Sequence, residues 1–313
     1  MAMDYKSSAK LLLGYDDFLI LTHKNPDGDT MGSAAALCSA LRRVGKTAWL
    51  YPNVQTSKKL MAYVGEFYAP EDFKPRSVIS VDTATESLMP KGYRGGADFC
   101  VDHHPTNSRY AKQYLIKDEK ASCGEIVLEL IKELCGDVTA QEATLLYIAV
   151  STDTGCFQYL NTRPDTLRAA AELMDLGAES GKVNVQFFRK LSPARLKLEG
   201  MAINGMELHR DGLISLVTVT QDMLNACGAT EDDLDDLANI AGRAETSRLN
   251  VTIREMPDGS SKLSLRSGPD INVSDICAVF GGGGHAMAAG CTIDASPEKA
   301  KELILSVIDE VWK

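Results

Sequence analysis

The sequence predicts an α/β protein in which a parallel sheet flanked by helices is followed by a smaller α/β domain. In the first half, short apolar runs bounded by Pro, Gly or polar residues alternate with helical patterns, which is typical of a parallel sheet. From about Val183 onward, period-2 strands with turn residues between them replace this alternation. A chain of 313 residues is long enough for about two domains with separate cores. We expect a first domain over residues 1–185, a linker helix over 186–200 and a second domain over 201–313.

The first half opens with the apolar run FLILTH, which predicts a strand that stops at the turn residues of NPDGD. The runs TAWLY, SVISVD and DFCVD predict further strands. Gly45 and Gly177 are good C-terminal stops, and Pro164 suits the start of a helix. Helical patterning is present in segments 30–45, 122–136, 141–155 and 163–178.

The second half is expected to begin with a mixed-charge connecting helix and to continue as strands. The segments LISLVTVT, SRLNVTIREM and SKLSLRS alternate apolar and polar residues, and the turn PDG separates the last two. The acidic run at 231–236 is typical of the solvated start of a helix.

The composition is that of an ordinary globular protein, with 44% hydrophobic and 24% charged residues. A net charge of −10 argues against a protein that grips long nucleic acid, which requires a basic surface. The eight cysteines include no C-x-x-C pair, which favours reduced thiols in the core. No signal peptide is recognisable, and no apolar run approaches the roughly 18 residues of a membrane span. We expect a cytoplasmic protein, a monomer or homodimer, that binds neither membranes nor long duplexes.

Carboxylate and imidazole groups gather at the ends of four segments in the first half. Because the carboxyl ends of parallel strands share one edge of a sheet, these groups can meet there. A lone Asp after a strand is more often a helix cap or turn residue, but the Asp-His-His triplet and the coincidence of four segments favour a metal site. Oxygen and imidazole donors without thiolate suit Mn²⁺ or a similar divalent ion. The candidate residues are His23, Asp27, Asp29, Asp82, His103, His104 and Asp153.

The four segments, HKNPDGDTMGS, VDT, DHHPTN and STDTG, in this order closely resemble those of the DHH phosphoesterases. The segment ASCGEIV at 121–127 also matches the family. In the second half, SLRS and FGGGGHAMAAG are similar to the DHH-associated substrate-binding domain. The resemblance covers nearly the whole chain. It is strongest to the short two-domain branch that includes NrnA-type oligoribonucleases and phosphatases and the cyclic-dinucleotide phosphodiesterases.

The resemblance implies a site for two divalent ions, with Mn²⁺ expected and Mg²⁺ or Co²⁺ as alternatives. Asp82 would bridge both ions and take part in catalysis, and His104 would face the substrate phosphate as a catalytic residue. Asp102 and Asn107 would support the site from behind, with Asp102 orienting a histidine ring. Which histidine of the triplet ligates metal stays open. The implied ligands are His23 and Asp27 for one ion, Asp29, His103 and Asp153 for the other, and Asp82 for both.

The glycine run of the second domain is expected to bind the substrate. Consecutive glycines let backbone N–H groups approach an anion, and a helix beginning after them would add its dipole. Arg266 can hold a terminal phosphate or carboxylate with its bidentate fork. Arg248 is a weaker candidate, for which a surface ion pair is the alternative. The expected substrate-binding residues are Arg248, Arg266, Ser267, Gly282, Gly283, Gly284 and His285.

These inferences predict a Mn²⁺-dependent phosphoesterase that hydrolyses short oligoribonucleotides or linear dinucleotides with a water activated by two metal ions. The 3′-phosphate of adenosine 3′,5′-bisphosphate is a further candidate substrate. A cyclic-dinucleotide phosphodiesterase, such as one acting on c-di-AMP, is the alternative, and a pyrophosphatase or exopolyphosphatase is a weaker one. A nucleotide-binding sensor without activity is disfavoured, because a competent ligand occupies every metal position.

Overall fold

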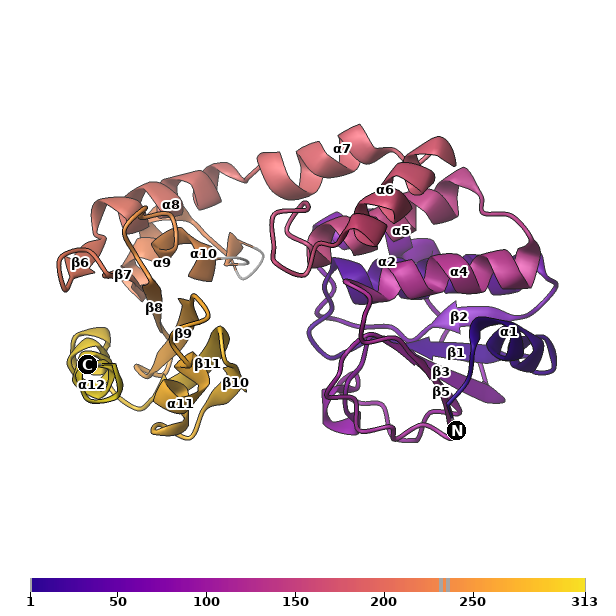
Figure 1. The fold of residues 1–313 in the computed structure, drawn as a ribbon, viewed down its shortest axis with the longest axis horizontal. Helices are drawn as coiled ribbons and strands as arrows, with labels where there is room; N and C mark the ends of the chain where they lie inside the picture. The colour runs from indigo at the N-terminus through magenta and orange to yellow at the C-terminus, as the bar shows by residue number, and fades with distance from the viewer. Residues whose placement is uncertain (1, 231–232, 235–236, 313) are drawn as a thin grey trace. The chain divides into compact units, whose positions relative to one another are not determined.

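The computed structural model describes residues 2–230, 233–234 and 237–312, so most of the acidic run at 231–236 lies outside the described residues. The chain forms two compact units, Met1–Lys190 and Leu191–Lys313. No helix in the described ranges is long and apolar enough to cross a membrane. The predicted α/β class is confirmed (Figure 1).

The connection between the units is not one continuous helix. Helix α7 (Ser180–Asn184) runs into a π-helical turn (Val185–Arg189), and the chain is then non-helical for three residues. Helix α8 (Pro193–Asn204) starts anew, with Ser192 as its N-cap. Proline has no N–H to donate and fits only the first turn of a helix, so the sequence itself places a helix start here. The helix expected over 186–200 is therefore divided.

The first unit is built on a five-stranded sheet in which every pair is parallel, in the order β2-β1-β3-β4-β5. The four strands expected from apolar runs are present, and β5 was not predicted. That strand lies at the edge and buries only Leu115 fully, so its sequence lacks the apolar run of a central strand. The strands are β1 (Phe18–Leu21), β2 (Ala48–Leu50), β3 (Ser77–Val81), β4 (Phe99–Asp102) and β5 (Gln113–Ile116).

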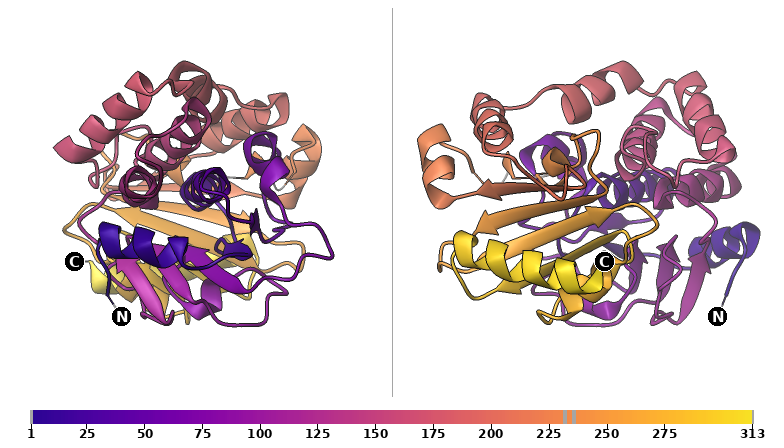
Figure 2. Two further views of the ribbon diagram at one scale, coloured as in Figure 1. Left: turned by 90° about the vertical axis from the view of Figure 1, so that its right-hand side faces the viewer. Right: turned by 60° about the vertical axis from the view of Figure 1, so that its left-hand side comes forward.

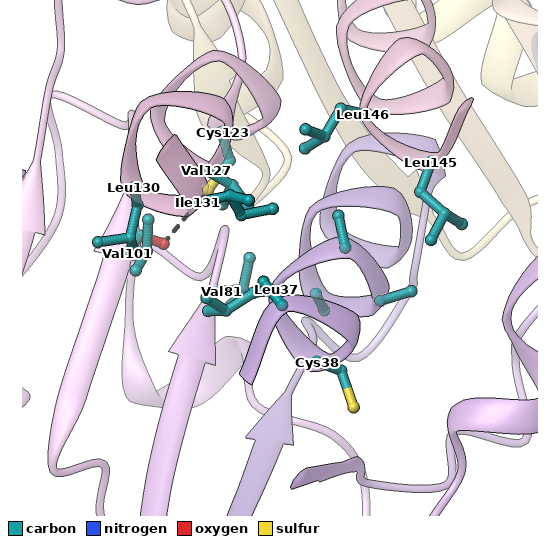
Figure 3. Close-up of a cluster of buried hydrophobic side chains, with 14 of the residues drawn as sticks. Leu37, Cys38, Val81, Val101, Cys123, Val127, Leu130, Ile131, Leu145 and Leu146 are labelled. Atoms are coloured by element: carbon teal, nitrogen blue, oxygen red, sulfur yellow. Dashed lines mark hydrogen bonds between the residues drawn. The ribbon is translucent and has the colours of Figure 1, made fainter. Parts of the chain in front are cut away.

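Helices α2, α4 and α5 form the core of this unit together with the sheet. Side chains of β3 and β4 pack against α2 and α4, and the Cys123 thiol donates to the carbonyl of Val101 at 3.4 Å (Figure 3). Helix α2 approaches α5 so closely that a Cβ on Gly32 would lie 2.3 Å from the carbonyl oxygen of Leu145. The helices of this unit before α7 are α1 (Tyr5–Leu13), α2 (Gly28–Arg43), α3 (Lys58–Val64), α4 (Cys123–Cys135), α5 (Ala140–Asp153) and α6 (Pro164–Asp175), with 3₁₀ turns at Gly65–Phe67 and Glu86–Leu88.

The second unit contains a six-stranded sheet in the order β10-β11-β9-β8-β7-β6, in which only the β7–β8 pair is parallel among the described residues. Ile214 and Leu216 of β7 belong to one hydrophobic cluster, and Val217 and Val219 belong to another, so both faces are covered. The strands are β6 (Glu207–His209), β7 (Ile214–Val219), β8 (Leu249–Glu255), β9 (Ser261–Ser267), β10 (Gly283–His285) and β11 (Ala288–Ile293).

Helix α12 runs along one face of this sheet, as the right-hand view of Figure 2 shows. It buries Ile304 and Ile308 in the same cluster as the strands β8 and β9. The three strands expected from period-2 patterning are β7, β8 and β9. The helices after α8 are α9 (Gln221–Cys227), α10 (Ala238–Ala241), α11 (Val273–Ala278) and α12 (Pro297–Val311).

Candidate two-metal active site

The candidate ligands gather at the carboxyl edge of the five-stranded sheet. Strand β1 is followed by His23 and then by α2, in which Asp27 is the N-cap and Asp29 lies in the first turn. Asp82 follows β3 directly, and the two histidines of the triplet follow β4. Asp153 is the last residue of α5, so this member of the site comes from a helix. The sequence therefore brings together residues from five elements, as the topology predicts.

The ligand atoms form overlapping groups, each within 4.8 Å. The first cluster is His23, Asp27 and Asp82, and the second cluster is Asp29, His103 and Asp153. A further group among the described residues consists of Asp82, His103 and His104. Every residue expected to ligate metal belongs to at least one of these groups, and Asp82 and His103 each belong to two.

Asp82 turns its two carboxylate oxygens toward different clusters. Its Oδ2 lies 3.7 Å from Nε2 of His23, and its Oδ1 lies 3.3 Å from Nε2 of His103. Oδ1 is buried and accepts no hydrogen bond from the described residues. A buried carboxylate oxygen that accepts no hydrogen bond is costly unless a charged group such as an imidazolium or a cation lies beside it. A bound cation would supply the interaction that this oxygen lacks.

The backbone at Asp82 is also unusual. Its φ of +55° lies in the left-handed region, which is sparsely populated by residues other than glycine. The conformation is held by the adjoining sheet, since Asp82 N–H donates to the carbonyl of Val101 at 2.9 Å. Strained residues of this kind cluster at functional sites, where the surrounding structure fixes them.

Asp29 is held by backbone amides that the sequence reasoning did not identify. The N–H groups of Cys123 and Gly124, at the start of α4, donate to its carboxylate at 2.7 and 2.9 Å, and Ser33 Oγ donates at 3.0 Å. The N-terminus of a helix favours a negative charge. The one available signal was the segment ASCGEIV, in which glycine allows a close approach: a Cβ on Gly124 would lie 2.7 Å from that of Ala149.

The crowding of carboxylates has clear electrostatic consequences. Burial, followed by the charges of Asp82 and Asp153, raises the pKa of Asp29 well above its usual range. Burial, with the charge of Asp82 adding to it, raises the pKa of Asp153 to about 7. Burial would lower the pKa of His103, but the surrounding carboxylates raise it to about 11. Besides burial, neighbouring carboxylates contribute to all three shifts, and divalent cations would neutralise their charge.

The two histidines of the triplet are held differently. His103 directs Nδ1 to the carbonyl of Lys120 at 3.3 Å and Nε2 into the second cluster, 3.8 Å from Asp29 Oδ2 and 3.7 Å from Asp153 Oδ2. His104 instead pairs its Nδ1 with Oδ1 of Asp102 at 2.7 Å. The geometry therefore favours His103 as the ligand.

Asp102 and Asn107 lie behind the triplet. Asp102 is fully buried, accepts from the N–H of His103 at 2.8 Å, and orients the ring of His104. Asn107 donates through Nδ2 to the other oxygen of Asp102. With Nδ1 engaged, the ring of His104 keeps Nε2 for another partner, and its side chain is 33% exposed.

In the second unit, the structure places Arg266 and His285 in one row of the sheet. His285 pairs with Ala288 across β10 and β11, and Ala288 pairs with Arg266 across β11 and β9. Directly paired residues project from the same face, so the two candidate side chains flank a small alanine. Ser267 is engaged locally, because its hydroxyl donates to the carbonyl of Ile271 at 2.6 Å.

The structure corrects the helix expected after the glycine run and gives Arg248 the ion pair that was its alternative role. No helix begins after the glycine run; β10 turns back into β11 as an antiparallel hairpin. The glycines allow strand contact: a Cβ on Gly282 would lie 2.3 Å from the carbonyl of Gly290, and one on Gly284 2.5 Å from that of Ala288. Arg248 forms an exposed ion pair with Asp270.

Comparison with known proteins places these features in a family. Residues 17–150 match the DHH family, N-terminal domain, and residues 219–313 match the DHHA1 domain. A bifunctional oligoribonuclease and PAP phosphatase NrnA from Thermus thermophilus is 31% identical over 93% of this chain and 89% of its own length. The protein of the same name from Bacillus subtilis is 29% identical over 89% of this chain and 90% of its own length. A cyclic-di-AMP phosphodiesterase PdeA from Listeria monocytogenes is 26% identical over 97% of this chain but 49% of its own length.

Solved structures share the fold. An exopolyphosphatase-related protein from Bacteroides fragilis has a TM-score of 0.88 at 21% identity, over 98% of this chain and 96% of that chain. The exonuclease RecJ bound to manganese has a TM-score of 0.55 at 13% identity, over 99% of this chain and 93% of that chain. The resemblance inferred from the sequence motifs is thus confirmed, and the chain belongs to the DHH family of metal-dependent phosphoesterases, with a DHHA1 domain following its DHH domain.

Proposed function

We propose that this protein hydrolyses the phosphodiester bonds of short oligoribonucleotides or linear dinucleotides. The 3′-phosphate of adenosine 3′,5′-bisphosphate is the second substrate we propose. Support comes from the similarity to oligoribonuclease and PAP phosphatase proteins over most of the chain. The net charge of −10 also favours short substrates, because it offers little attraction for long nucleic acid.

The observation that carries the proposal is the placement of Asp82 between two ligand clusters. His23 and Asp27, together with Oδ2 of Asp82, would hold one divalent ion. The second cluster, together with Oδ1 of Asp82, would hold the other. When bound, the two ions would supply an activated water and a clamp for the phosphoryl oxygens. The mixed oxygen and nitrogen donors suit Mn²⁺, with Mg²⁺ or Co²⁺ as alternatives. Structurally similar RecJ exonucleases are bound to manganese in one structure and to Mg²⁺ in another.

His104 has the geometry of a substrate-facing group. Asp102 holds its Nδ1, which leaves Nε2 to donate a hydrogen bond to a non-bridging phosphate oxygen or to the leaving oxygen. Burial would lower the pKa of His104, whereas Asp102 and Asp82 raise it, which favours the protonated donor. In the second unit, Arg266 and His285 are proposed to bind a terminal phosphate or the nucleoside, with the backbone of Gly282–Gly284 nearby.

One substrate panel tests the proposal. With Mn²⁺ present, we expect a linear dinucleotide to be cleaved fastest, the bisphosphate to be dephosphorylated, and a long RNA to be cleaved slowly. Pyrophosphate and a cyclic dinucleotide complete the panel. Cleavage of pyrophosphate alone would refute the proposal. Preference for the cyclic dinucleotide would instead favour the activity named for the Listeria relative.

A further inference from the structure

A short stretch at the start of α4 contacts the second cluster from behind. The carbonyl of Lys120 lies 3.3 Å from Nδ1 of His103. The first two amides of α4 donate to both oxygens of Asp29 at 2.7 and 2.9 Å. Two of the three residues of the second cluster are therefore oriented by residues 120–124.

Asn161 connects this stretch to the third residue, Asp153. Its Nδ2 lies 3.2 Å from the carbonyl oxygen of Ala121 and 3.1 Å from that of Asp153. A carboxamide nitrogen carries two hydrogens, so one Asn161 side chain can donate to both carbonyls. The carbonyl of Asp153 is one of the last four of α5, and such carbonyls have no partner inside the helix. Asn161 thus joins the end of α5 to the stretch that orients His103 and Asp29.

The first cluster is oriented by other groups. The carbonyl of His23 accepts from Asn53 Nδ2 at 3.0 Å. Asp27 accepts from the N–H of Thr30 at 3.1 Å, within its own helix turn. None of these contacts passes through Asn161. Loss of the Asn161 amide would therefore act on one cluster and leave the other in place.

We propose that Asn161 is a positioning residue for the second cluster and sets the affinity of the ion bound there. The inference rests on the proposed two-ion function. The stretch at 120–124 keeps a separate support, because the N–H of Ala121 donates to Glu125 Oε1 at 3.1 Å and Thr166 donates to the same oxygen at 2.9 Å. The loss of the amide should consequently release Asp153 without unfolding the stretch.

The test compares Mn²⁺ binding to the wild type and to Asn161→Ala and Asn161→Asp, by calorimetric titration and by EPR. The aspartate variant keeps the shape of the side chain but cannot donate. Gln158→Ala is the matched control, since it removes a carboxamide from the same loop. This side chain is exposed and forms no hydrogen bond among the described residues. Thermal unfolding of each metal-free variant checks that it folds.

We expect the wild type and the Gln158 control to bind two ions and to give the EPR signal of a coupled pair. Both Asn161 variants should bind one ion normally and the other about 10-fold more weakly, so that a mononuclear signal replaces the coupled one at limiting Mn²⁺. Wild-type affinity for both ions in both variants would overturn the role of Asn161 alone. A wild type that binds fewer than two ions would overturn the proposed function and this inference with it.

Discussion

At the scale of single residues, the site depends on a few carboxylates that lie close together although their negative charges repel one another. Asp82 has a left-handed backbone, is 4% exposed and keeps one oxygen without a hydrogen bond in the described structure. Such a group is unfavourable by itself and is explained by the ions that the site would hold.

The substitution Asp82→Asn tests this role. The amide keeps the size of the side chain but removes the charge shared by both clusters. We therefore expect kcat/KM on a dinucleotide to fall more than about 100-fold, which is more than the loss of a residue that only supports a ligand usually causes. Steady-state kinetics with Mn²⁺ measures the loss. Asp165→Asn, at an exposed position of α6, is the control with unchanged activity. Near-normal turnover by the Asp82 variant would contradict the bridging role.

Residue type predicted the candidate ligands because carboxylate and imidazole groups can be read directly from the sequence. It did not identify the amides of Cys123 and Gly124, since every residue except proline carries an N–H group. Asn161 was missed for a related reason: its partners are two backbone carbonyls, which only the folded chain brings together.

At the scale of secondary-structure elements, the central strands and long helices of the first unit were predictable from apolar runs, helical periodicity and stop residues. Strand β5 and strand β10 were missed because they are short or poor in apolar residues, whereas α12 was missed although it is 15 residues long and buries Ile304 and Ile308. Strand β10 is exposed throughout and consists of two glycines and a histidine, so its strand character comes from pairing with β11.

The pair Gly282→Ala and Gly283→Ala tests why this run contains glycine. The Cβ at position 282 would lie 2.3 Å from the carbonyl of Gly290, whereas the one at position 283 would have no neighbour within 4 Å. We expect the first substitution to lower the free energy of unfolding by about 1–3 kcal/mol and the second to change it little. Urea denaturation measures both. Equal stability of the two variants would show that the close approach of Gly282 to Gly290 does not require glycine.

At the scale of the whole molecule, the proposed metal site links stability to pH. The folded-state pKa of Asp153 is raised to about 7 and that of His103 to about 11, so these two side chains together bind more protons in the metal-free folded protein than in the unfolded chain between about pH 4 and pH 11. Stability must then decrease as pH rises through this range, because the folded state gives up protons that the unfolded state has already lost.

We therefore expect the metal-free protein to lose roughly 5 °C in Tm between pH 6 and pH 9, and excess Mn²⁺ to remove most of the difference. Differential scanning calorimetry in the presence of a chelator, and then of Mn²⁺, measures both curves. Asp153→Asn should make the metal-free curve shallower, since its side chain no longer titrates whereas His103 still does. A Tm that rises with pH in the chelated protein would contradict the charge arrangement described for the site.

The sequence by itself determined the α/β class through periodicity and the carboxylate and imidazole groups through residue type, and the resemblance of its motifs indicated the family. Tertiary structure decided how those groups are oriented. It directed the two oxygens of Asp82 to separate clusters and turned Nε2 of His103, rather than that of His104, toward Asp29 and Asp153. It also paired the glycine run with β11 in place of a helix. The physical reason is common to all three: side-chain direction and strand pairing depend on contacts between segments far apart in the chain, which local sequence does not encode.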